Sequence, residues 1–204
     1  MIYERGIKRV LDFTFALIGL ILAAIPMGIV AIAIKMESRG PVIFKQDRIG
    51  YKGKVYKMYK FRSMCVGAEK GGVYSDNTDT RVTRVGKFIR ATSIDELPQL
   101  VNVLKGDMAL IGFRSPLTYH PWPWDEYTEE QKKMFNVRPG ITGWAQVNGR
   151  KTVEWNRRIE LNVWYAEHVS FLLDLKILFL TVYKVLANAD NENIGETVKE
   201  QKNK

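Results

Sequence analysis

Residues 91–116, ATSIDELPQLVNVLKGDMALIGFRSP, form the stretch around which the rest of the chain is organised. Two adjacent carboxylates, Asp95 and Glu96, precede an apolar run that indicates a helix, and a second apolar run leads to Arg114. Ser93 and Glu96 have the Ser-x-x-Glu spacing of a capping box, which is typical of a helix start. The same pair could also serve one chemical site in two different roles, because adjacent helical residues point about 100° apart.

The composition indicates a single domain with an acidic partner. A length of 204 residues suits one domain, or one domain with an attachment. The formal net charge of +9 favours nucleic acid, anionic lipid headgroups or phosphorylated substrates as partners. Cys65 is the single cysteine, which excludes an intramolecular disulfide and favours a reducing compartment. We expect Cys65 to be an ordinary buried thiol.

An apolar segment near the N-terminus predicts membrane association. Phe13–Ile34 is a run of 22 uncharged residues, and about 20 are needed to cross a bilayer. The run is too long for the apolar core of a signal peptide, which usually has about 7–15 residues. An entirely buried core helix is the alternative.

Pro26 distinguishes two topologies for this segment. A proline inside a helix removes a hydrogen bond and bends or breaks the helix. Basic residues flank both ends of the segment, and the positive-inside rule keeps such flanks in the cytoplasm. We therefore expect residues 1–38 to form a re-entrant membrane helix, broken at Pro26, that enters and leaves on one face. A simple span is the alternative.

The remainder predicts an α+β, mainly helical domain over residues 39–187, followed by a polar, disordered tail over residues 188–204. Val42–Lys45 and Val55–Phe61 have the composition of two strands in a short hairpin. Basic residues alternate with aromatic residues in the second strand. We expect its aromatic face to be packed and its basic face to be exposed and available to phosphate.

The second half of the domain is predicted to be helical around an irregular loop. Glu129–Phe135 and Glu154–His168 have helical periodicity. Phe171–Ala187 is strongly apolar but carries charged residues, so we expect an amphipathic helix at the membrane surface or packed against the domain. The two tryptophans of Thr118–Trp124 would lie at a membrane interface or in a packed surface loop.

The glycine-rich segment RPGITGWAQVNGRK, residues 138–151, predicts an anion site. Its glycines would let the backbone approach a ligand closely, and Arg138 and Arg150 lie near its two ends. The spacing is not that of a dinucleotide-binding or Walker loop. His120 and His168 lack metal-ligand spacing, so we expect both to be structural or exposed.

Four motifs, taken together, resemble one protein family. They are KFRSM at residues 60–64, DELPQL at 95–100, NVLKGDM at 102–108 and RPGITGWAQVNGR at 138–150. In sequence and order they resemble the bacterial sugar transferases, the monotopic polyprenyl-phosphate phosphoglycosyl transferases. The resemblance runs from about Lys8 to about Leu186. It implies a re-entrant helix and a small catalytic domain on the cytoplasmic face of the bacterial inner membrane.

The resemblance also implies a reaction. A sugar-1-phosphate would pass from a UDP-sugar to undecaprenyl phosphate with release of UMP, assisted by Mg²⁺, as the first membrane step of a bacterial glycoconjugate pathway. Asp95 would be the nucleophile that forms a covalent aspartyl-phosphosugar, with Glu96 as its partner and both as Mg²⁺ ligands. Carboxylates suit both tasks. Phosphate would be bound by cationic side chains, for which the candidates are Lys60, Arg62, Arg90, Arg114, Arg138 and Arg150.

Three positions depart from the family pattern. Residues 112–116 read Gly-Phe-Arg-Ser-Pro where the family has Gly-Pro-Arg-Pro, Asn162 replaces an aspartate, and Ile25 replaces a serine before Pro26. The resemblance implies membrane lipids as surroundings and downstream glycosyltransferases as partners. It leaves open a homodimer, gives no reason to expect nucleic acid, and does not name the sugar.

Two interpretations from other classes remain open. A membrane-anchored nucleic-acid-binding module would use the net charge and the basic and aromatic residues of the hairpin. An inactive scaffold for other glycan enzymes is suggested by Asn162 and by the altered sequence around Arg114. Turnover by the purified protein would exclude the scaffold, and salt-sensitive binding of oligonucleotides would support the nucleic-acid module.

Overall fold

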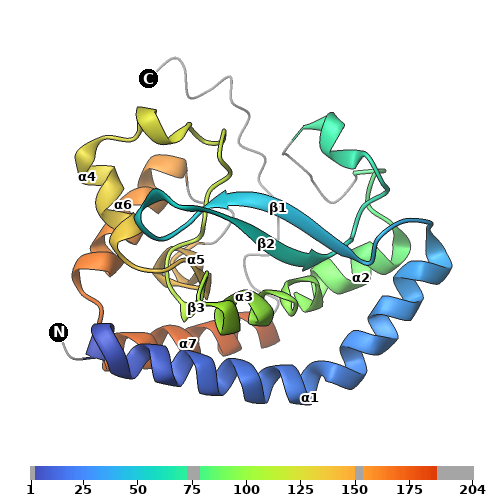
Figure 1. The fold of residues 1–204 in the computed structure, drawn as a ribbon, viewed down its shortest axis with the longest axis horizontal. Coiled ribbons are helices and arrows are strands. Elements are labelled where there is room, and N and C mark those ends of the chain that lie inside the picture. The colour runs from blue at the N-terminus through green and yellow to red at the C-terminus, as the bar shows by residue number, and fades with distance from the viewer. Residues whose placement is uncertain (1–2, 73–78, 150–153, 188–204) are drawn as a thin grey trace.

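A computed structural model describes residues 3–72, 79–149 and 154–187. It is mainly helical with two small sheets (Figure 1), which confirms the predicted α+β class. The predicted tail, residues 188–204, and Arg150 lie outside the described residues. The helices are α1 (Lys8–Glu37), α2 (Arg84–Ala91), α3 (Gln99–Lys105), α4 (Glu129–Lys132), α5 (Trp144–Val147), α6 (Trp155–Glu167) and α7 (Phe171–Leu186), and the strands are β1 (Ile43–Ile49), β2 (Val55–Phe61), β3 (Ala109–Ile111) and β4 (Gly140–Thr142).

Helix α1 is long and apolar enough to cross a membrane. Its 30 residues would extend about 45 Å at 1.5 Å per residue. Only 11% of its most apolar window is buried, and Leu22 and Ile25 are 75% and 78% exposed. We expected a break at Pro26. The helix instead continues through Pro26 and bends along its length (Figure 1), which a proline permits when the flanking turns stay paired.

The N-terminal end of α1 is bound to the domain that follows it. Lys8 Nζ lies 2.6 Å from Asp174 Oδ2 of α7, and the hydroxyl of Tyr165 donates to the other oxygen of the same carboxylate at 2.6 Å. The Arg9 guanidinium donates to the carbonyl oxygen of Val103 at 2.7 Å. The last carbonyls of a helix such as α3 lack partners within the helix, so a cation there is favourable.

The C-terminal end of α1 is bound to the same domain. The Arg62 guanidinium, at the end of β2, donates to the carbonyl oxygens of Ser38 and Arg39 at 2.9 and 2.6 Å. The Glu37 carboxylate accepts from the backbone N–H of Arg84 at 2.7 Å, at the start of α2. Both ends of the apolar helix are therefore anchored on one domain.

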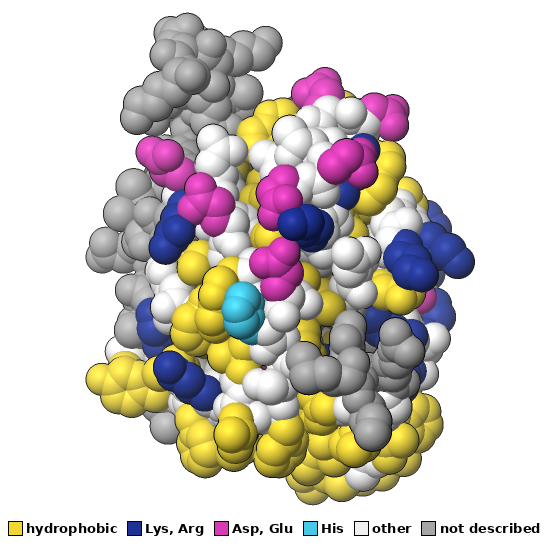
Figure 2. All heavy atoms as spheres, turned by 90° about the vertical axis from the view of Figure 1, so that its left-hand side faces the viewer, with side chains coloured by type: hydrophobic (Ala, Val, Ile, Leu, Met, Phe, Trp, Pro, Cys, Tyr) yellow, Lys and Arg dark blue, Asp and Glu magenta, His cyan; other side chains and the backbone are white. Residues whose placement is uncertain are grey.

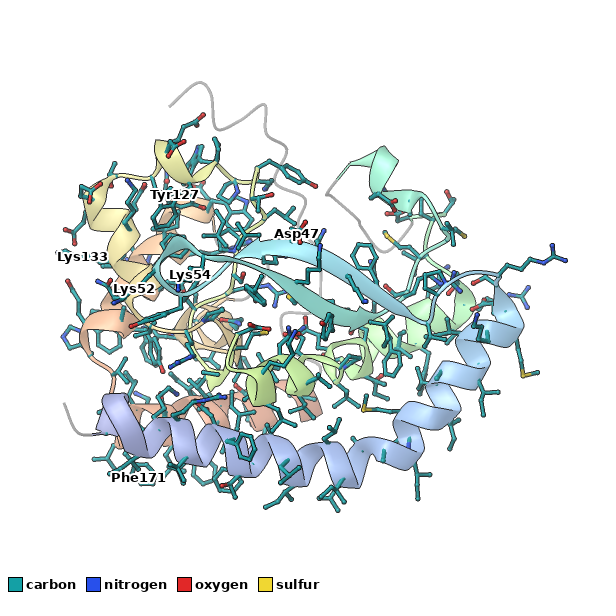
Figure 3. The ribbon with its side chains drawn as sticks, in the orientation of Figure 1. Asp47, Lys52, Lys54, Tyr127, Lys133 and Phe171 are labelled. Carbon is teal, nitrogen blue, oxygen red and sulfur yellow. The ribbon has the colours of Figure 1, made fainter. Side chains whose placement is uncertain are left out.

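Strands β1 and β2 form the predicted antiparallel hairpin, with Ile43 opposite Phe61 and Ile49 opposite Val55. The first strand is longer than expected. Tyr56 and Phe61 are buried. Lys57 is exposed and pairs with Asp47 at 3.1 Å on the outer face (Figure 3). The prediction of a packed aromatic face and an exposed basic face is wrong in part: Tyr56 is buried and Lys57 exposed, but Lys60 lies on the same face as Tyr56 and is largely buried.

Strands β3 and β4 form a short parallel pair that we did not predict. Three glycines permit it, because the two backbones lie side by side at very short range. A Cβ on Gly112 would collide with the backbone of Arg138 and Gly140, and a Cβ on Gly143 would collide with the carbonyl oxygen of Gly112. Gly140 and Gly143 therefore allow one backbone to approach another, whereas we had expected a ligand there.

The predicted helices of the second half are present as α4, α6 and α7. Figure 2 shows hydrophobic side chains along the lower edge of the molecule, where Figure 1 places α1 and α7. Phe171 lies at this edge (Figure 3), with its ring 5.9 Å from that of Tyr3. Leu172 and Phe179 of α7 are 75% and 68% exposed. Helix α7 thus extends the exposed apolar surface of α1.

The remaining predictions on irregular segments have mixed outcomes. The rings of Trp122 and Trp124 pack against Tyr127 and Phe135 at centroid distances of 5.7 and 4.9 Å. Of the two alternatives, the structure therefore has the packed loop. Cys65 is exposed, so the prediction of a buried thiol is wrong: the chain stays buried through Ser63 after β2 and reaches the surface only at Cys65.

Candidate active site

The carboxylate pair lies in a 3₁₀ turn, Ile94–Glu96, between α2 and α3. The predicted capping box is wrong. Ser93 has a left-handed backbone (φ 57°), and its side chain does not cap the turn that follows. Helix α3 starts only at Gln99, after Pro98. Proline is favoured near a helix start because it lacks the N–H that would remain unpaired there. The pair consequently lies before the helix.

Glu96 is fixed by two cations from distant parts of the chain. Lys60 Nζ of β2 lies 2.7 Å from Glu96 Oε1, and both side chains are largely buried. Arg114 NH2, from the loop after β3, lies 3.4 Å from the same oxygen. These contacts bring together three of the predicted site residues. They also hold the Glu96 side chain in one position.

Asp95 is buried, and its surroundings shift the pKa of its carboxyl in opposite directions. Burial raises the pKa of its carboxyl, as does the charge of Glu96, whereas the positive charges of Lys60, Arg90 and Arg114 lower it. Burial is the larger effect. Within the described residues, no group donates a hydrogen bond to this carboxylate. Asp95 is therefore a partly desolvated carboxylate in a cationic site, which suits a nucleophile more than a structural ion pair.

Arg90 is the third cation at the site. Its Nε donates to the hydroxyl of Ser63 at 2.8 Å, which fixes the guanidinium between α2 and the end of β2. Burial lowers the pKa of Arg90, and the nearby Asp95 carboxylate raises it. Lys60, Arg90 and Arg114 thus come from three separate segments and surround the carboxylate pair, as their predicted role requires.

Arg48 is a cation next to the site that the sequence analysis did not single out. Its guanidinium donates to the carbonyl oxygen of Ser115 at 2.8 Å and to the side-chain oxygen of Gln46 at 2.7 Å. Burial, and then the charge of Arg114, lower the pKa of Arg48 to about 10, so it stays charged at neutral pH. The predicted strand ended at Lys45, so Arg48 fell outside it. A longer strand would have placed this charged side chain on the packed face.

Arg48 and Arg114 line a small recess beside the acidic pair together with Gln99. Gln99 is 2% exposed, and its Nε2 makes no hydrogen bond within the described residues. Two guanidinium groups and an amide N–H are all donors. The recess therefore suits an acceptor such as a phosphate oxygen.

Two of the predicted phosphate ligands have other partners. Arg62 binds the carbonyls at the end of α1. Arg138 Nε donates to the carbonyl oxygen of Gly106 at 3.0 Å, and its guanidinium lies over the ring of Tyr51. The structure gives both a structural role, and their contact with phosphate remains a prediction. Arg150 lies outside the described residues.

Asp95 and Glu96 also fit the donor chemistry of Mg²⁺. The described residues contain no cluster of three or more His, Cys, Asp or Glu that could hold a metal. Mg²⁺ does not need such a cluster, because it is usually bound by one or two carboxylates together with substrate phosphates and water. His120 packs edge-on against Trp155, and His168 stacks on Trp164. Both histidines are packed against aromatic rings.

The fold and the site define a class of protein: a small domain with a carboxylate pair in a cationic site, mounted on a long apolar helix. The chain belongs to the bacterial sugar transferase family, which matches residues 3–188. This confirms the resemblance that the four motifs indicated.

Several relatives are similar over most of this chain. It is 45% identical over 192 residues to the uncharacterized sugar transferase EpsL of Bacillus subtilis (strain 168), covering 94% of this chain and 91% of that protein. It is 42% identical to the UDP-glucose:undecaprenyl-phosphate glucose-1-phosphate transferase of Escherichia coli (strain K12), covering 91% of this chain and 41% of that protein. A UDP-N-acetylgalactosamine-undecaprenyl-phosphate N-acetylgalactosaminephosphotransferase of Aeromonas hydrophila is 42% identical, with 88% and 44% covered. The chain thus spans less than half of the latter two relatives.

Proposed function

We propose that the chain transfers a sugar-1-phosphate from a UDP-sugar to undecaprenyl phosphate, giving undecaprenyl-diphosphate-sugar and UMP. The observation that carries this proposal is the buried Asp95 carboxylate beside Lys60, Arg90 and Arg114. Relatives at 42% identity are named for transfer of glucose-1-phosphate or N-acetylgalactosamine phosphate to undecaprenyl phosphate. A site of this kind attracts a phosphate and presents a nucleophile to it.

The reaction would proceed in two displacements at one phosphorus atom. In the first, an oxygen of Asp95 attacks the phosphorus that carries the sugar, the bond from that phosphorus to the UMP oxygen breaks, and UMP leaves. In the second, an oxygen of the lipid phosphate attacks the same phosphorus, and the bond to Asp95 breaks. The carboxylate is regenerated, so the steps balance without another reactant.

The cations and Glu96 would support both steps. Lys60, Arg90 and Arg114 offset the negative charge of the diphosphate and of the transition state, where fixed positive groups are most effective. Arg48 would hold a phosphate oxygen in the donor-lined recess. Mg²⁺, held by Asp95 and Glu96 with the donor phosphates, would supply further charge neutralisation when bound.

The anchoring of α1 supports a re-entrant helix. Lys8 and Arg9 at one end, and Glu37 at the other, bind the same domain. A spanning helix would place its two ends on opposite faces of the bilayer, where one small domain cannot contact both. The bent helix would enter and leave on the cytoplasmic face and hold the site at the depth of the lipid phosphate. Homodimers and association with downstream glycosyltransferases remain predictions.

Release of UMP tests this function. Purified protein in nanodiscs would receive undecaprenyl phosphate, Mg²⁺ and a panel of UDP-sugars. We expect lipid-dependent UMP release from at least one donor, and multiple turnovers abolished in Asp95→Asn. Full activity in Asp95→Asn would contradict the mechanism, and silence across a broad panel would contradict the proposed reaction.

A further inference from the structure

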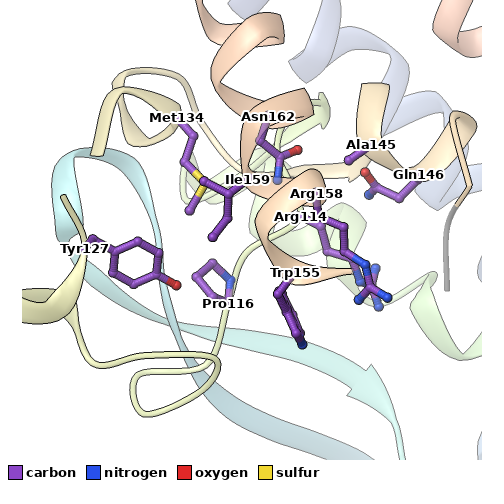
Figure 4. A pocket seen from close by; sticks show the side chains of 10 residues that line it. All are labelled: Arg114, Pro116, Tyr127, Met134, Ala145, Gln146, Trp155, Arg158, Ile159 and Asn162. Atoms are coloured by element: carbon purple, nitrogen blue, oxygen red, sulfur yellow. The ribbon is translucent and has the colours of Figure 1, made fainter. Parts of the chain in front are cut away.

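A second recess lies between α5, α6 and the loop after β3, next to Arg114. Its lining includes Arg114, Gln146, Tyr127 and Asn162 (Figure 4). Arg114 also contacts Glu96, so this residue separates the recess from the carboxylate pair. A group bound here would therefore lie next to the reacting phosphate.

Polar atoms in this recess lack partners although they are buried. Asn162 is 4% exposed and Tyr127 is 2% exposed. Among the described residues, Asn162 Oδ1, the Tyr127 hydroxyl, both amide atoms of Gln146 and Arg158 Nε make no hydrogen bond. Figure 4 shows the side chains of Asn162, Tyr127 and Gln146 on different sides of the recess. Buried polar groups are nearly always paired, so their concentration here indicates a site for a hydrogen-bonding group.

The mixture of atoms identifies the chemistry of that group. Asn162 Oδ1 and Gln146 Oε1 are acceptors, Gln146 Nε2 and Arg158 Nε are donors, and the Tyr127 hydroxyl can be either. Phosphate at neutral pH presents mainly acceptors and would face two unfavourable oxygens. A hydroxyl both donates and accepts, and it carries no charge to desolvate. The recess presents both acceptors and donors and therefore fits a hydroxyl, which can pair with both kinds of atom.

The size of the cavity limits the group further. Its volume is about 20 Å³, which is enough for one water molecule or one hydroxyl but not for a whole sugar or nucleobase. The apolar side chains of Met134 and Ile159 complete its walls. A single projecting substituent fits, with the ring that carries it remaining outside near Arg114.

We propose that Asn162, Gln146 and Tyr127 form a subsite for one hydroxyl group of the donor sugar, and that this contact determines which UDP-sugar the protein prefers. The inference rests on the proposed function. A site with buried polar groups rejects a substrate that cannot pair them much more strongly than an apolar pocket rejects an extra group. Donors that differ only in the placement of one hydroxyl would be separated in this way.

The test is direct binding of donors, which does not depend on turnover. Isothermal titration would use Asp95→Asn protein in nanodiscs without lipid acceptor. The ligands would be UMP and whichever of UDP-glucose, UDP-galactose and UDP-N-acetylgalactosamine the wild-type protein uses best. We expect Asn162→Leu and Gln146→Leu each to weaken donor binding by about tenfold, with UMP binding unchanged. Asn162→Asp keeps the acceptor oxygen and should retain most of the donor affinity.

UDP-sugars that lack one hydroxyl of the sugar provide a second test of the subsite. Removing the contacted hydroxyl from the sugar should weaken binding to the parent protein but not to the Asn162→Leu variant. An equal loss of UMP affinity would place the nucleotide in the recess, and unchanged donor affinity would leave only a water there; either result would overturn the inference. Gln146 is only half-buried, so Gln146→Leu keeps the test valid if Asn162→Leu does not fold. Failure of the wild-type protein to release UMP from any donor would overturn the proposed function and this inference with it.

Discussion

Lys60 Nζ lies 2.7 Å from Glu96 Oε1, and this ion pair separates the tasks of two adjacent carboxylates. Glu96 is held by cations, whereas its neighbour Asp95 is buried without a hydrogen bond from the described residues. The positive charge of Lys60 also lowers the pKa of Asp95 against the effect of burial. One lysine thus positions the partner carboxylate and favours the ionised form of the nucleophile.

Substitution of Lys60 should therefore change the pH dependence of the reaction. Asp95 must be ionised to attack, and loss of the lysine charge raises the pKa of its carboxyl further. We expect the acidic limb of kcat/KM in Lys60→Met to move to higher pH, in addition to a lower maximum. Lys57→Met, on the exposed face of the same strand, is the matched control and should leave the limb in place. An unchanged acidic limb in Lys60→Met would show that Lys60 does not affect Asp95.

Asp95 should also reduce the stability of the folded protein at neutral pH. The pKa of its carboxyl is raised above its ordinary value of 3.8, so the folded state binds the proton more tightly than the unfolded state. Stability then falls as pH rises from the ordinary value through the raised one. We expect Asp95→Asn to unfold at a higher temperature than wild type at pH 7–8, with the difference shrinking as the pH falls. A lower unfolding temperature for Asp95→Asn at pH 8 would contradict this assignment.

The glycines at the close contact between β3 and β4 should not tolerate a side chain. A Cβ at Gly112 would collide with the backbone of Arg138 and Gly140, and backbone cannot move as a flexible side chain can. We expect Gly112→Ala to lower the free energy of unfolding by about 2 kcal/mol or more. Gly28→Ala in α1 is the control, because a Cβ there meets no atom within 4 Å. Equal thermal shifts for the two variants would mean that this contact is not tightly packed.

The topology of α1 can be tested by labelling from one side of sealed vesicles. Cys65 is exposed, so the experiment requires a Cys65→Ser background. Single cysteines at Arg5 and Arg39 should react with an impermeant maleimide from the same side, because both ends of α1 bind one domain. We also expect Pro26→Leu to straighten the helix and favour a span. If the two cysteines react from opposite sides in the protein that retains Pro26, α1 is a true span.

The local sequence pattern was enough to predict the hairpin strand β2 and the helices α6 and α7. The composition of β2, the periodicity of α6 and the apolar composition of α7 were sufficient to place these elements. The capping box failed, since Pro98 moves the start of α3 past the carboxylates. The β3–β4 pair could not be predicted, because strands of three residues carry no periodicity and this pairing depends on glycine contacts distant in sequence.

The sequence predicted only part of the candidate site. Asp95, Glu96 and three of the cations follow from the resemblance and are brought together by the fold. Arg48 was missed because the predicted strand ended at Lys45. Arg62 was predicted to bind phosphate, but in the structure it binds the end of α1. A basic residue in a motif can serve the fold or the substrate. Only the three-dimensional contacts distinguish the two roles.

Intact-protein mass spectrometry would detect the covalent bond that we propose between Asp95 and the phosphosugar. Wild-type protein would be incubated with its UDP-sugar and Mg²⁺ without undecaprenyl phosphate, and then quenched in acid. We expect a mass increase equal to one sugar phosphate, one UMP released per protein, loss of the adduct on addition of the lipid, and no adduct in Asp95→Asn. Turnover with lipid but no adduct under any quenching condition, or an adduct that persists in Asp95→Asn, would contradict this proposal.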